Sequence, residues 1–322
     1  MKTFLLLVLG AFILSGYAQE PVTSSSEVRL ETMTGALHGT LLVPEAESPI
    51  TVALILPGSG PTDRNGNGPL VQTDAYKLLA EALAENGVAS LRIDKRGVGE
   101  SAAALPNEAD IRFNTYISDA VGWLAQLRED PRFGEVAVIG HSEGALVGLL
   151  AAKQADADLY VSLAGAGERA SNTLRTQLSA QLPDALMQEV DTVLSRLEAG
   201  QTVDPLPENI AGVPGVANLF RPSVQPYLIS WFKYDPAREI ASLEVPTLII
   251  QGTTDIQVSA KDAQKLKAAK PDAELVMVEE MNHVLKAAPI ERSANLATYN
   301  DPSLPLADGL IGPLITFLEE VD

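Results

Sequence analysis

Residues 136–144 read VAVIGHSEG, an apolar run followed by a serine with a glycine two positions away on each side. The apolar run predicts a buried strand, and the run of leucines and small residues at 143–153 predicts a helix. A serine on a sharp turn between a strand and a helix is typical of a catalytic nucleophile with an exposed hydroxyl. The glycines fit this interpretation because side chains at positions 140 and 144 would collide with neighbouring backbone. We therefore expect Ser142 to be a nucleophile at the end of a strand.

Strands and helices alternate on both sides of this turn. Apolar runs predict eight strands, at 28–33, 36–44, 51–56, 88–93, 135–140, 159–164, 246–251 and 274–279. Helical periodicity predicts helices at 74–86, 110–128, 143–153, 259–267 and 308–319. Continuous apolar strands separated by helices favour an α/β fold with an eight-stranded, mostly parallel sheet and helices on both faces. The Thr34-Gly35 pair predicts a hairpin between the first two strands, and the Ser-rich residues 19–27 predict a flexible leader.

One long segment interrupts this alternation. Residues 169–242 show helical periodicity without convincing strands, and a Pro-rich stretch lies between Pro205 and Pro226. We expect residues 169–242 to form a helical insertion over one end of the sheet. The sheet domain would then comprise residues 19–168 and 243–322.

A serine nucleophile requires a base, and the chain offers three histidines. His141 adjoins Ser142, and on a tight turn its side chain would point away, so we expect it to shape the turn. His38 lies within a strand of the hairpin, far from the expected end of the sheet. His283 lies in the loop directly after the last strand, and it is therefore our candidate for the base.

The third member of the site should orient the base and stabilise its protonated form. Asp255 follows the strand at 246–251, which places it at the same sheet edge as Ser142. Asp272 precedes a strand, at the opposite edge, and Pro271-Asp272 is typical of a turn. We therefore predict a triad of Ser142, Asp255 and His283.

Two backbone amides should bind the negative oxygen that forms when the serine attacks a carbonyl group. One donor would be the amide of Glu143, at the amino end of a helix whose dipole favours negative charge. The other would come from the loop LPGSGP at 56–61, where glycines permit close approach. We favour the amide of Ser59 over that of Gly60.

Composition excludes several classes of protein. The 322-residue chain is 46% hydrophobic, which excludes intrinsic disorder. Its 23 basic and 42 acidic residues give a net charge of −19, which argues against nucleic acid as a partner. The chain has no cysteine, so disulfides, cysteine–zinc sites and thiol catalysis are excluded. Three histidines argue against a multi-histidine metal site, and we expect neither metal nor cofactor.

The first eighteen residues, MKTFLLLVLGAFILSGYA, resemble an export signal. Lys2 precedes an apolar run from Phe4 to Leu14, and small residues follow it. We expect residues 1–18 to be a signal peptide cleaved after Ala18, giving a secreted or periplasmic protein; a short membrane anchor is the alternative. No second apolar stretch approaches spanning length, so we expect no stable membrane span in the mature form.

Four motifs, in order, resemble the α/β-hydrolase superfamily, and in particular its secreted serine esterases with a helical cap. They are LPGSGPTDRNG at 56–66, RIDKRGVGES at 92–101, GHSEG at 140–144, and GTTDIQV at 252–258 with NH at 282–283. The resemblance covers residues 36–322 and implies esterase activity on small acyl esters, with residues 169–242 as the cap. Pro57 stands where many relatives have histidine, and this difference leaves the second oxyanion donor open between Ser59 and Gly60.

Other side chains have both structural and functional interpretations. Asp94, Arg96 and Gly97 should brace the loop that contains them. Arg64 could bind an acidic substrate, but an ion pair within the protein is the stronger expectation, and a buried ion pair is also expected for the Glu143 side chain. Five aromatic residues of the insertion could line an acyl pocket or pack the insertion on the core, namely Phe220, Tyr227, Trp231, Phe232 and Tyr234. Tyr227 and Trp231 are our candidates for substrate contact.

The residues together predict a cofactor-free serine carboxylesterase that acts on a small-molecule ester through an acyl-enzyme on Ser142. A serine peptidase or aminopeptidase on the same fold is the first alternative, because one triad serves both reactions. A non-catalytic binding protein that keeps the fold is the second. The sequence favours no oligomeric state, acyl length or alcohol.

Overall fold

An eight-stranded sheet forms the centre of the protein, with strand order β1-β2-β4-β3-β5-β6-β7-β8. A computed structural model describes residues 23–46 and 49–319, so the expected signal peptide lies outside the described residues. The strands are β1 Thr23–Thr32, β2 Gly35–Pro44, β3 Ile50–Leu56, β4 Ala89–Ile93, β5 Phe133–His141, β6 Leu159–Leu163, β7 Thr247–Gly252 and β8 Glu274–Val278. The pairs β1–β2 and β2–β4 are antiparallel, and all other neighbours are parallel. The expected eight-stranded, mostly parallel sheet is confirmed.

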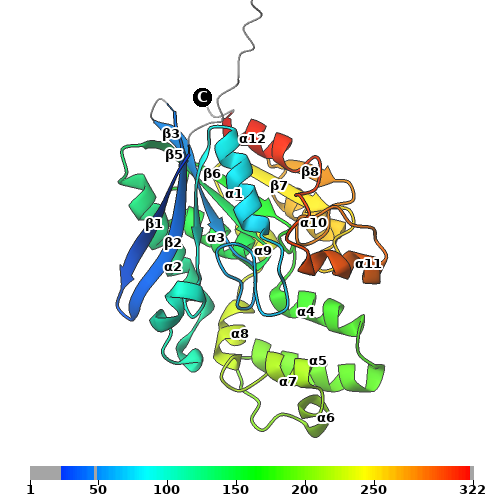
Figure 1. The fold of residues 1–322 in the computed structure, drawn as a ribbon. Helices are drawn as coiled ribbons and strands as arrows, with labels where there is room; N and C mark the ends of the chain where they lie inside the picture. Colours follow the sequence, from blue (N-terminus) through cyan, green and yellow to red (C-terminus); the bar gives the residue numbers. More distant parts are fainter. Residues whose placement is uncertain (1–22, 47–48, 320–322) are drawn as a thin grey trace, which may run out of the picture.

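Helices cover both faces of this sheet, which explains why its central strands are apolar on both sides. Helices α1 (Ala75–Glu85) and α12 (Ile311–Glu319) pack on the face that contains Ala53 and Ile55 of β3. Helices α2 (Phe113–Arg128), α3 (Glu143–Gln154) and α10 (Ala260–Ala269) pack on the other face. Figure 1 shows α1 and α12 on the near side of the sheet. None of the helices in the described ranges combines the length and the apolar character needed to cross a membrane.

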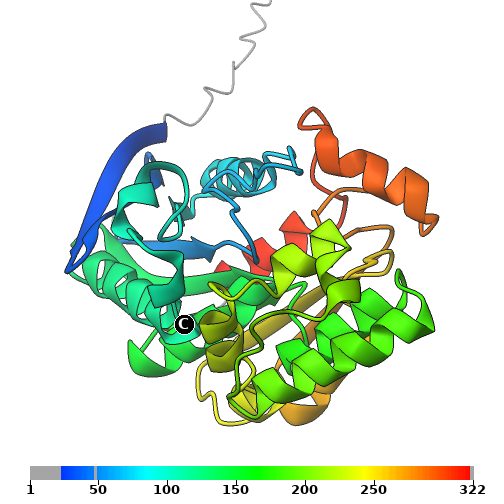
Figure 2. The same ribbon diagram turned by 90° about the horizontal axis from the view of Figure 1, so that it is seen from below.

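Six helices lie between β6 and β7 in the chain. They are α4 Ala170–Ser179, α5 Asp184–Glu198, α6 Glu208–Ala211, α7 Pro214–Leu219, α8 Gln225–Trp231 and α9 Pro236–Ile240. Figure 1 shows α4 to α8 gathered beyond one end of the sheet, and Figure 2 views the molecule from that end. The buried Gln225 side chain holds the Pro-rich stretch by bonding both backbone groups of Val203 and the Phe220 carbonyl at 2.7–2.8 Å.

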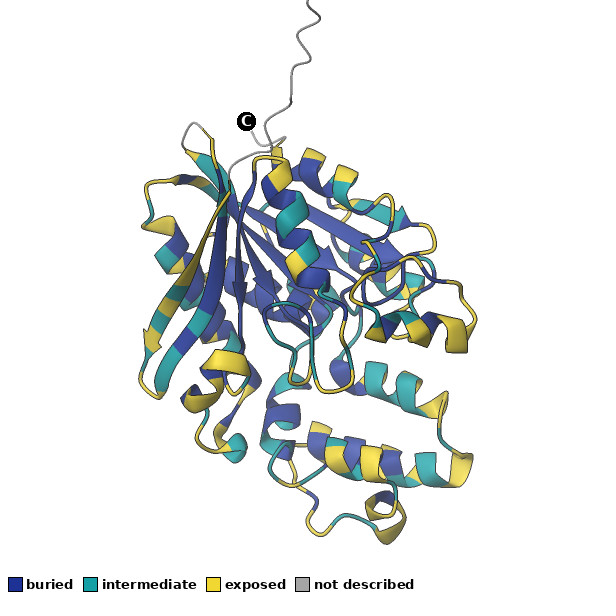
Figure 3. Cartoon of the chain, in the orientation of Figure 1, coloured by how far each residue is buried: buried dark blue, intermediate teal, exposed yellow. Residues whose placement is uncertain are grey.

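The beginning of β1 corrects the sequence-based expectation of a flexible leader. Residues 23–27 are part of a strand that pairs with β2 from Thr23↔Pro44 onwards. The side chains of β1 are mostly exposed (Figure 3), and those of residues 23–27 all are, so this half of the strand lacks the apolar alternation that predicts a strand at 28–33. Its pairing is made by backbone groups, which hydropathy does not detect.

The turn between β5 and α3 has the strained geometry that its glycines predict. Ser142 adopts φ 54° and ψ −118°, a conformation rare for residues with a side chain. A Cβ at Gly144 would lie 2.6 Å from the Pro57 carbonyl oxygen, and one at Gly140 would lie 2.6 Å from the Ala145 Cα. The expected steric collision is therefore confirmed, and it shows how closely the turn approaches the end of β3.

Substitution of Gly144 by alanine should lower the free energy of unfolding by about 3 kcal/mol, because the added methyl group overlaps backbone that cannot move independently. Urea denaturation measures this change. Gly215→Ala is the matched control, because the Cβ position of this residue of α7 has nothing within 4 Å. The free energy of unfolding of this control should be unchanged or rise by up to about 1 kcal/mol. Equal stability of the two variants would contradict the close approach of the turn.

Candidate active site

Three loops at the carboxyl edge of the sheet bring Ser142, His283 and Asp255 together. The Ser142 Oγ lies 3.1 Å from the His283 Nε2, and the His283 Nδ1 lies 2.8 Å from the Asp255 Oδ2. Because a carboxylate only accepts hydrogen bonds, the Nδ1 of a neutral His283 carries the proton. Its Nε2 is then free to accept the proton of the serine hydroxyl. The three side chains predicted from sequence are therefore adjacent and correctly ordered for nucleophilic activation.

The Asp255 carboxylate is fully buried and held by several donors. Its Oδ1 accepts the amides of Gln257 and Val258 at 2.7 and 2.9 Å, and its Oδ2 accepts the Gln251 side chain at 3.1 Å. Burial alone would raise the pKa of Asp255, but the His283 charge and these hydrogen bonds outweigh it and hold the pKa below its ordinary value. The carboxylate thus stays charged where it can stabilise a protonated His283.

His141 connects the turn to the loop that contains His283. Its Nε2 lies 2.8 Å from the His283 carbonyl oxygen, which can only accept, so the Nε2 carries the proton. Its Nδ1 therefore accepts from the Tyr76 hydroxyl at 2.8 Å, and the Tyr76 oxygen in turn accepts the Gly58 amide at 3.0 Å. This chain of bonds joins the loop after β3, the Ser142 turn and the His283 loop. The ring nitrogens of His141 thus bond Tyr76 and the His283 backbone rather than the Ser142 hydroxyl.

The two competing residues lie elsewhere. His38 is in β2, paired with Arg29 of β1. Asp272 lies in the exposed turn before β8, where its carboxylate pairs with Lys270 at 2.8 Å. Neither residue contacts the triad.

The candidate oxyanion donors lie beside Ser142. A Cβ built on Gly58 would stand 3.3 Å from the Ser142 Cβ, which places the loop after β3 directly against the nucleophile. Ser59, Gly60 and Glu143 line the same cleft as Ser142. Within the described ranges, the amides of Ser59 and Glu143 donate to no protein acceptor. Both are therefore available to a ligand.

Ser142 opens into a cleft of about 760 Å³ between the sheet and the helices α4, α7 and α8. Apolar side chains make up much of its wall, namely Leu105, Ile111, Leu146, Leu174, Leu178, Leu219, Val224, Tyr227, Leu228 and Trp231. Charged residues also line it, namely Lys95, Arg96, Glu108, Glu143, Glu168 and Arg221. Trp231 stacks on Phe113 with ring centres 5.7 Å apart. Of the five aromatic candidates, Tyr227 and Trp231 line the cleft, whereas Phe220 and Phe232 are buried in the core. The Tyr234 hydroxyl accepts a hydrogen bond from Asn114 at 2.7 Å.

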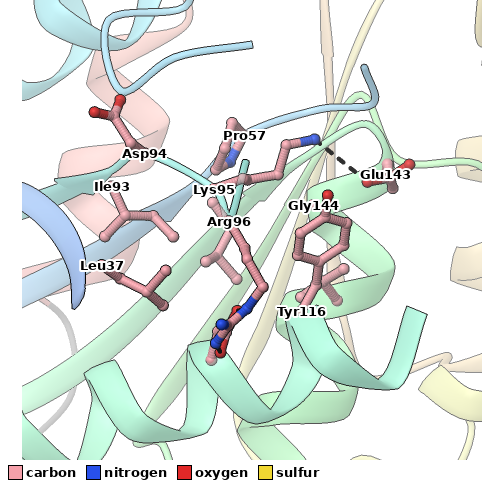
Figure 4. A pocket seen from close by; sticks show the side chains of 12 residues that line it. Leu37, Pro57, Ile93, Asp94, Lys95, Arg96, Tyr116, Glu143 and Gly144 are labelled. Atoms are coloured by element: carbon pink, nitrogen blue, oxygen red, sulfur yellow. Dashed lines mark hydrogen bonds and ion pairs between the residues drawn. The ribbon is translucent and has the colours of Figure 1, made fainter. Parts of the chain in front are cut away.

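The Glu143 side chain forms the expected buried ion pair. Its Oε1 lies 3.6 Å from the Lys95 Nζ, and both side chains are almost fully buried. Figure 4 shows the pair beside a small cavity of about 20 Å³, with Tyr116 and Pro57 next to it. Burial raises the pKa of Tyr227 well above its usual value, and the Glu143 carboxylate adds to this effect.

Arg64 and the residues after β4 have structural partners, as expected. Arg64 is buried and pairs with Asp94 at 2.8 Å and with Glu27 and Glu100. Arg96 makes a two-bonded pair with Asp119 of α2, at 2.6 and 3.0 Å. These contacts anchor β1 and the loop after β4.

Two buried asparagines, neither of them a predicted site residue, fix the loops of the triad. Asn282 accepts the amides of Val284 and Lys286 at 3.2 and 3.1 Å, which closes the His283 loop. Asn295, in helix α11 (Arg292–Ala297), donates to the Thr254 carbonyl at 2.9 Å, one residue before Asp255. The adjacency of Asn282 and His283 was the only sequence signal, because α11 is too short to show periodicity.

Replacement of His141 by glutamine should make stability less dependent on pH. Burial and the nearby His283 ring lower the pKa of His141 to about 3, against 6.5 for a free side chain. Below pH 6.5 the unfolded chain binds a proton at His141 that the folded chain does not bind. The folded state is therefore not penalised by this residue above pH 6.5, and it loses stability as the pH falls below that value. Between pH 6.5 and 5 the free energy of unfolding of the wild type should fall by about 2 kcal/mol more than that of His141→Gln. Urea denaturation at both pH values checks this, and parallel losses would show that His141 is not buried neutral.

Comparison with known proteins agrees with this architecture. The model of the alpha/beta hydrolase family matches residues 53–298, well over half of the chain. A curated relative, Esterase EstD of Thermotoga maritima, is 26% identical over 267 residues, which are 79% of this chain and 60% of the relative. The chain thus spans about three fifths of the length of the curated relative that it matches.

Solved structures with the same fold include three proteins. Est1E from Butyrivibrio proteoclasticus, solved with ferulic acid, has 16% identity and a TM-score of 0.57 over 91% of this chain and 96% of its own. GrgF from Penicillium sp. sh18 has 20% identity and a TM-score of 0.53, over 81% of this chain and 91% of its own. The esterase Pf2001 from Pyrococcus furiosus has 18% identity and a TM-score of 0.51, over 81% of this chain and 85% of its own. At these identities the likeness concerns the fold alone.

The sheet order and the strained serine turn agree with the family match. This chain belongs to the α/β-hydrolase family, as the family match over residues 53–298 establishes.

Proposed function

We propose that this protein is a serine carboxylesterase that hydrolyses small acyl esters through an acyl-enzyme on Ser142. The observation that carries the proposal is the hydrogen-bonded series from Ser142 through His283 to Asp255, at 3.1 and 2.8 Å, at the base of an apolar cleft. The similarity to a named esterase supports the choice of substrate class. A carboxylic ester fits this site because its apolar acyl group can enter the cleft while its carbonyl carbon reaches Ser142.

The geometry supports a two-step reaction. His283 Nε2 takes the hydroxyl proton as the Ser142 oxygen bonds to the ester carbonyl carbon, and the carbonyl electron pair moves onto oxygen. The amides of Glu143 and Ser59 donate to that oxygen. The intermediate then expels the alcohol, which takes the proton from His283, and leaves an acyl group on Ser142. Water, deprotonated by His283, attacks this group and releases the acid.

We further propose that residues 169–242 act as a cap that shapes the acyl site. Helices α4, α7 and α8 contribute Leu174, Leu178, Leu219 and Leu228 to the cleft, and the aromatic rings of Tyr227 and Trp231 form part of its wall. The apolar side chains that these helices contribute favour an uncharged acyl group, since burying a charge against them would remove its hydration without a partner.

Ser142→Ala should lower kcat for p-nitrophenyl acetate by about 10⁶-fold, because the nucleophile acts as a unit with its base. Ser59→Ala is the control, since it keeps the backbone amide that the mechanism uses and removes only an exposed hydroxyl. The kcat of Ser59→Ala should stay within about threefold of the wild-type value. Loss of an oxyanion donor would lower kcat far more than this. Near-wild-type turnover by correctly folded Ser142→Ala, checked by circular dichroism, would refute the proposal.

Trp231→Ala should change the preference for acyl length, because loss of the indole enlarges the cleft. We expect the ratio of kcat/KM for p-nitrophenyl octanoate to that for the acetate to rise about tenfold. Phe232→Leu, which alters a neighbouring aromatic residue buried away from the cleft, should leave the ratio unchanged. An unchanged ratio in Trp231→Ala would exclude this residue from the acyl site.

A further inference from the structure

Lys95 lies behind the nucleophile and takes no part in the triad. Its side chain follows β4, is 6% exposed and points towards the loop after β3. The ammonium group donates to the Gly58 carbonyl oxygen at 2.6 Å. It also lies 3.6 Å from the Glu143 Oε1 and 5.3 Å from the centre of the Tyr116 ring (Figure 4). One buried cation thus contacts both segments that carry the candidate oxyanion donors.

The bond to Gly58 fixes one peptide plane. The Gly58 carbonyl and the Ser59 amide belong to the same peptide unit, and this unit is trans. In a trans unit the C=O and N–H vectors point in opposite directions. When Lys95 holds the carbonyl on the buried side, the Ser59 N–H must therefore point the other way. Ser59 lines the cleft together with Ser142, so that direction leads to the open side.

The preceding peptide unit is also held. The Gly58 amide donates to the Tyr76 hydroxyl at 3.0 Å, so Gly58 is fixed on both its backbone groups. Gly60, by contrast, has φ 75° and nothing within 4 Å of its Cβ position. A preorganised donor needs a fixed direction, and among the two candidate amides this condition favours Ser59.

We propose that Lys95 is a positioning residue for the oxyanion hole, which aims and strengthens the Ser59 N–H by holding the Gly58 carbonyl. The proposal rests on the proposed esterase function and assigns the second donor to Ser59 rather than Gly60. A cation on the carbonyl oxygen also polarises the amide, which makes its N–H a stronger donor to developing negative charge.

The cost of burying this ion pair supports a role beyond folding. Burial lowers the pKa of Lys95, an effect that Glu143 partly offsets. A buried ion pair adds little net stability, and neutral side chains of similar size often replace one without loss. The ammonium faces Glu143 and the Tyr116 ring, and Glu143 is the carboxylate that balances it. Asp94, Arg96 and Asp119 line the same small cavity, but Asp94 pairs with Arg64 and Asp119 with Arg96. The Lys95–Glu143 pair is therefore better explained by orienting the Ser59 amide than by stabilising the fold.

The test compares Lys95→Met with the double variant Lys95→Met/Glu143→Gln, in which no carboxylate is left unpaired. Both keep the backbone amides of Ser59 and Glu143. For p-nitrophenyl acetate we expect kcat to fall about 100-fold in both, with KM within about threefold, because the interaction strengthens only as the oxyanion forms. The double variant should be as stable as the wild type in urea.

A second readout reports on the oxyanion itself. A trifluoromethyl ketone labelled with ¹³C at its carbonyl adds to the serine hydroxyl and forms a tetrahedral hemiketal. The ¹³C chemical shift changes when the hemiketal hydroxyl ionises, so titrating it with pH gives the pKa of that hydroxyl. We expect this pKa to rise by about one to two units in both variants, because one unit corresponds to a tenfold loss of anion stabilisation. A residue with a purely structural role would leave this pKa unchanged.

Chemical rescue provides the control. The chain contains no cysteine, so Lys95→Cys introduces a unique thiol. Its thiolate displaces bromide from 2-bromoethylamine and forms an S–C bond, which restores an ammonium group at the length of lysine. Propylation with 1-bromopropane gives the uncharged analogue. The kcat of the aminoethylated protein should be at least about tenfold higher than that of the propylated protein.

The outcomes separate the two proposals. Wild-type kcat and hemiketal pKa in the folded double variant, or equal activity of the aminoethylated and propylated proteins, would overturn the role of Lys95 and leave the esterase proposal standing. Failure of the wild type to form the hemiketal on Ser142 would overturn the esterase proposal and, with it, the role of Lys95.

Discussion

The close contact between the Ser142 turn and the end of β3 is the constraint on which the rest of the site depends. Gly144 allows the turn to pack against the backbone of Leu56 and Pro57 at distances that no side chain would permit, and Gly140 allows the same close approach to Gly144 and Ala145. Ser142 is thereby held at φ 54°. The same contact brings the loop after β3 against the nucleophile, so one packing requirement places the serine and both candidate oxyanion donors.

Buried polar side chains then connect this contact to the base. Tyr76 and His141 join the loop after β3 to the His283 carbonyl, while Asn282 and Asn295 fasten the loops of His283 and Asp255. Each bond is made in the interior, where an unpaired partner would be costly, so the loops are held in one arrangement. The site is rigid because its supporting groups are buried, even though its reacting groups lie on loops.

The sequence predicted the parts of the site that follow directly from a strand. Ser142, Asp255 and His283 each come just after an apolar run, and the scarcity of histidine left few candidates for the base. Lys95 could not be assigned in this way because its partner is a backbone carbonyl 37 positions away, brought near only by the sheet. Asn295 was missed for the same reason. Periodicity alone did not separate Tyr227 and Trp231, the two candidates that line the cleft, from the buried Phe220 and Phe232. Residues 23–27 of edge strand β1 had no apolar pattern to detect.

The most direct test of the account is covalent labelling of the native protein with a fluorophosphonate, followed by tryptic digestion and mass spectrometry. The tryptic peptide of residues 133–153 contains Ser142 as its only serine, threonine or tyrosine, so its label can be placed without ambiguity. The account predicts one adduct per native chain, on this peptide, and none on the urea-denatured chain. No adduct on the native protein, or an adduct on a different peptide, would contradict a serine nucleophile activated by His283 and Asp255.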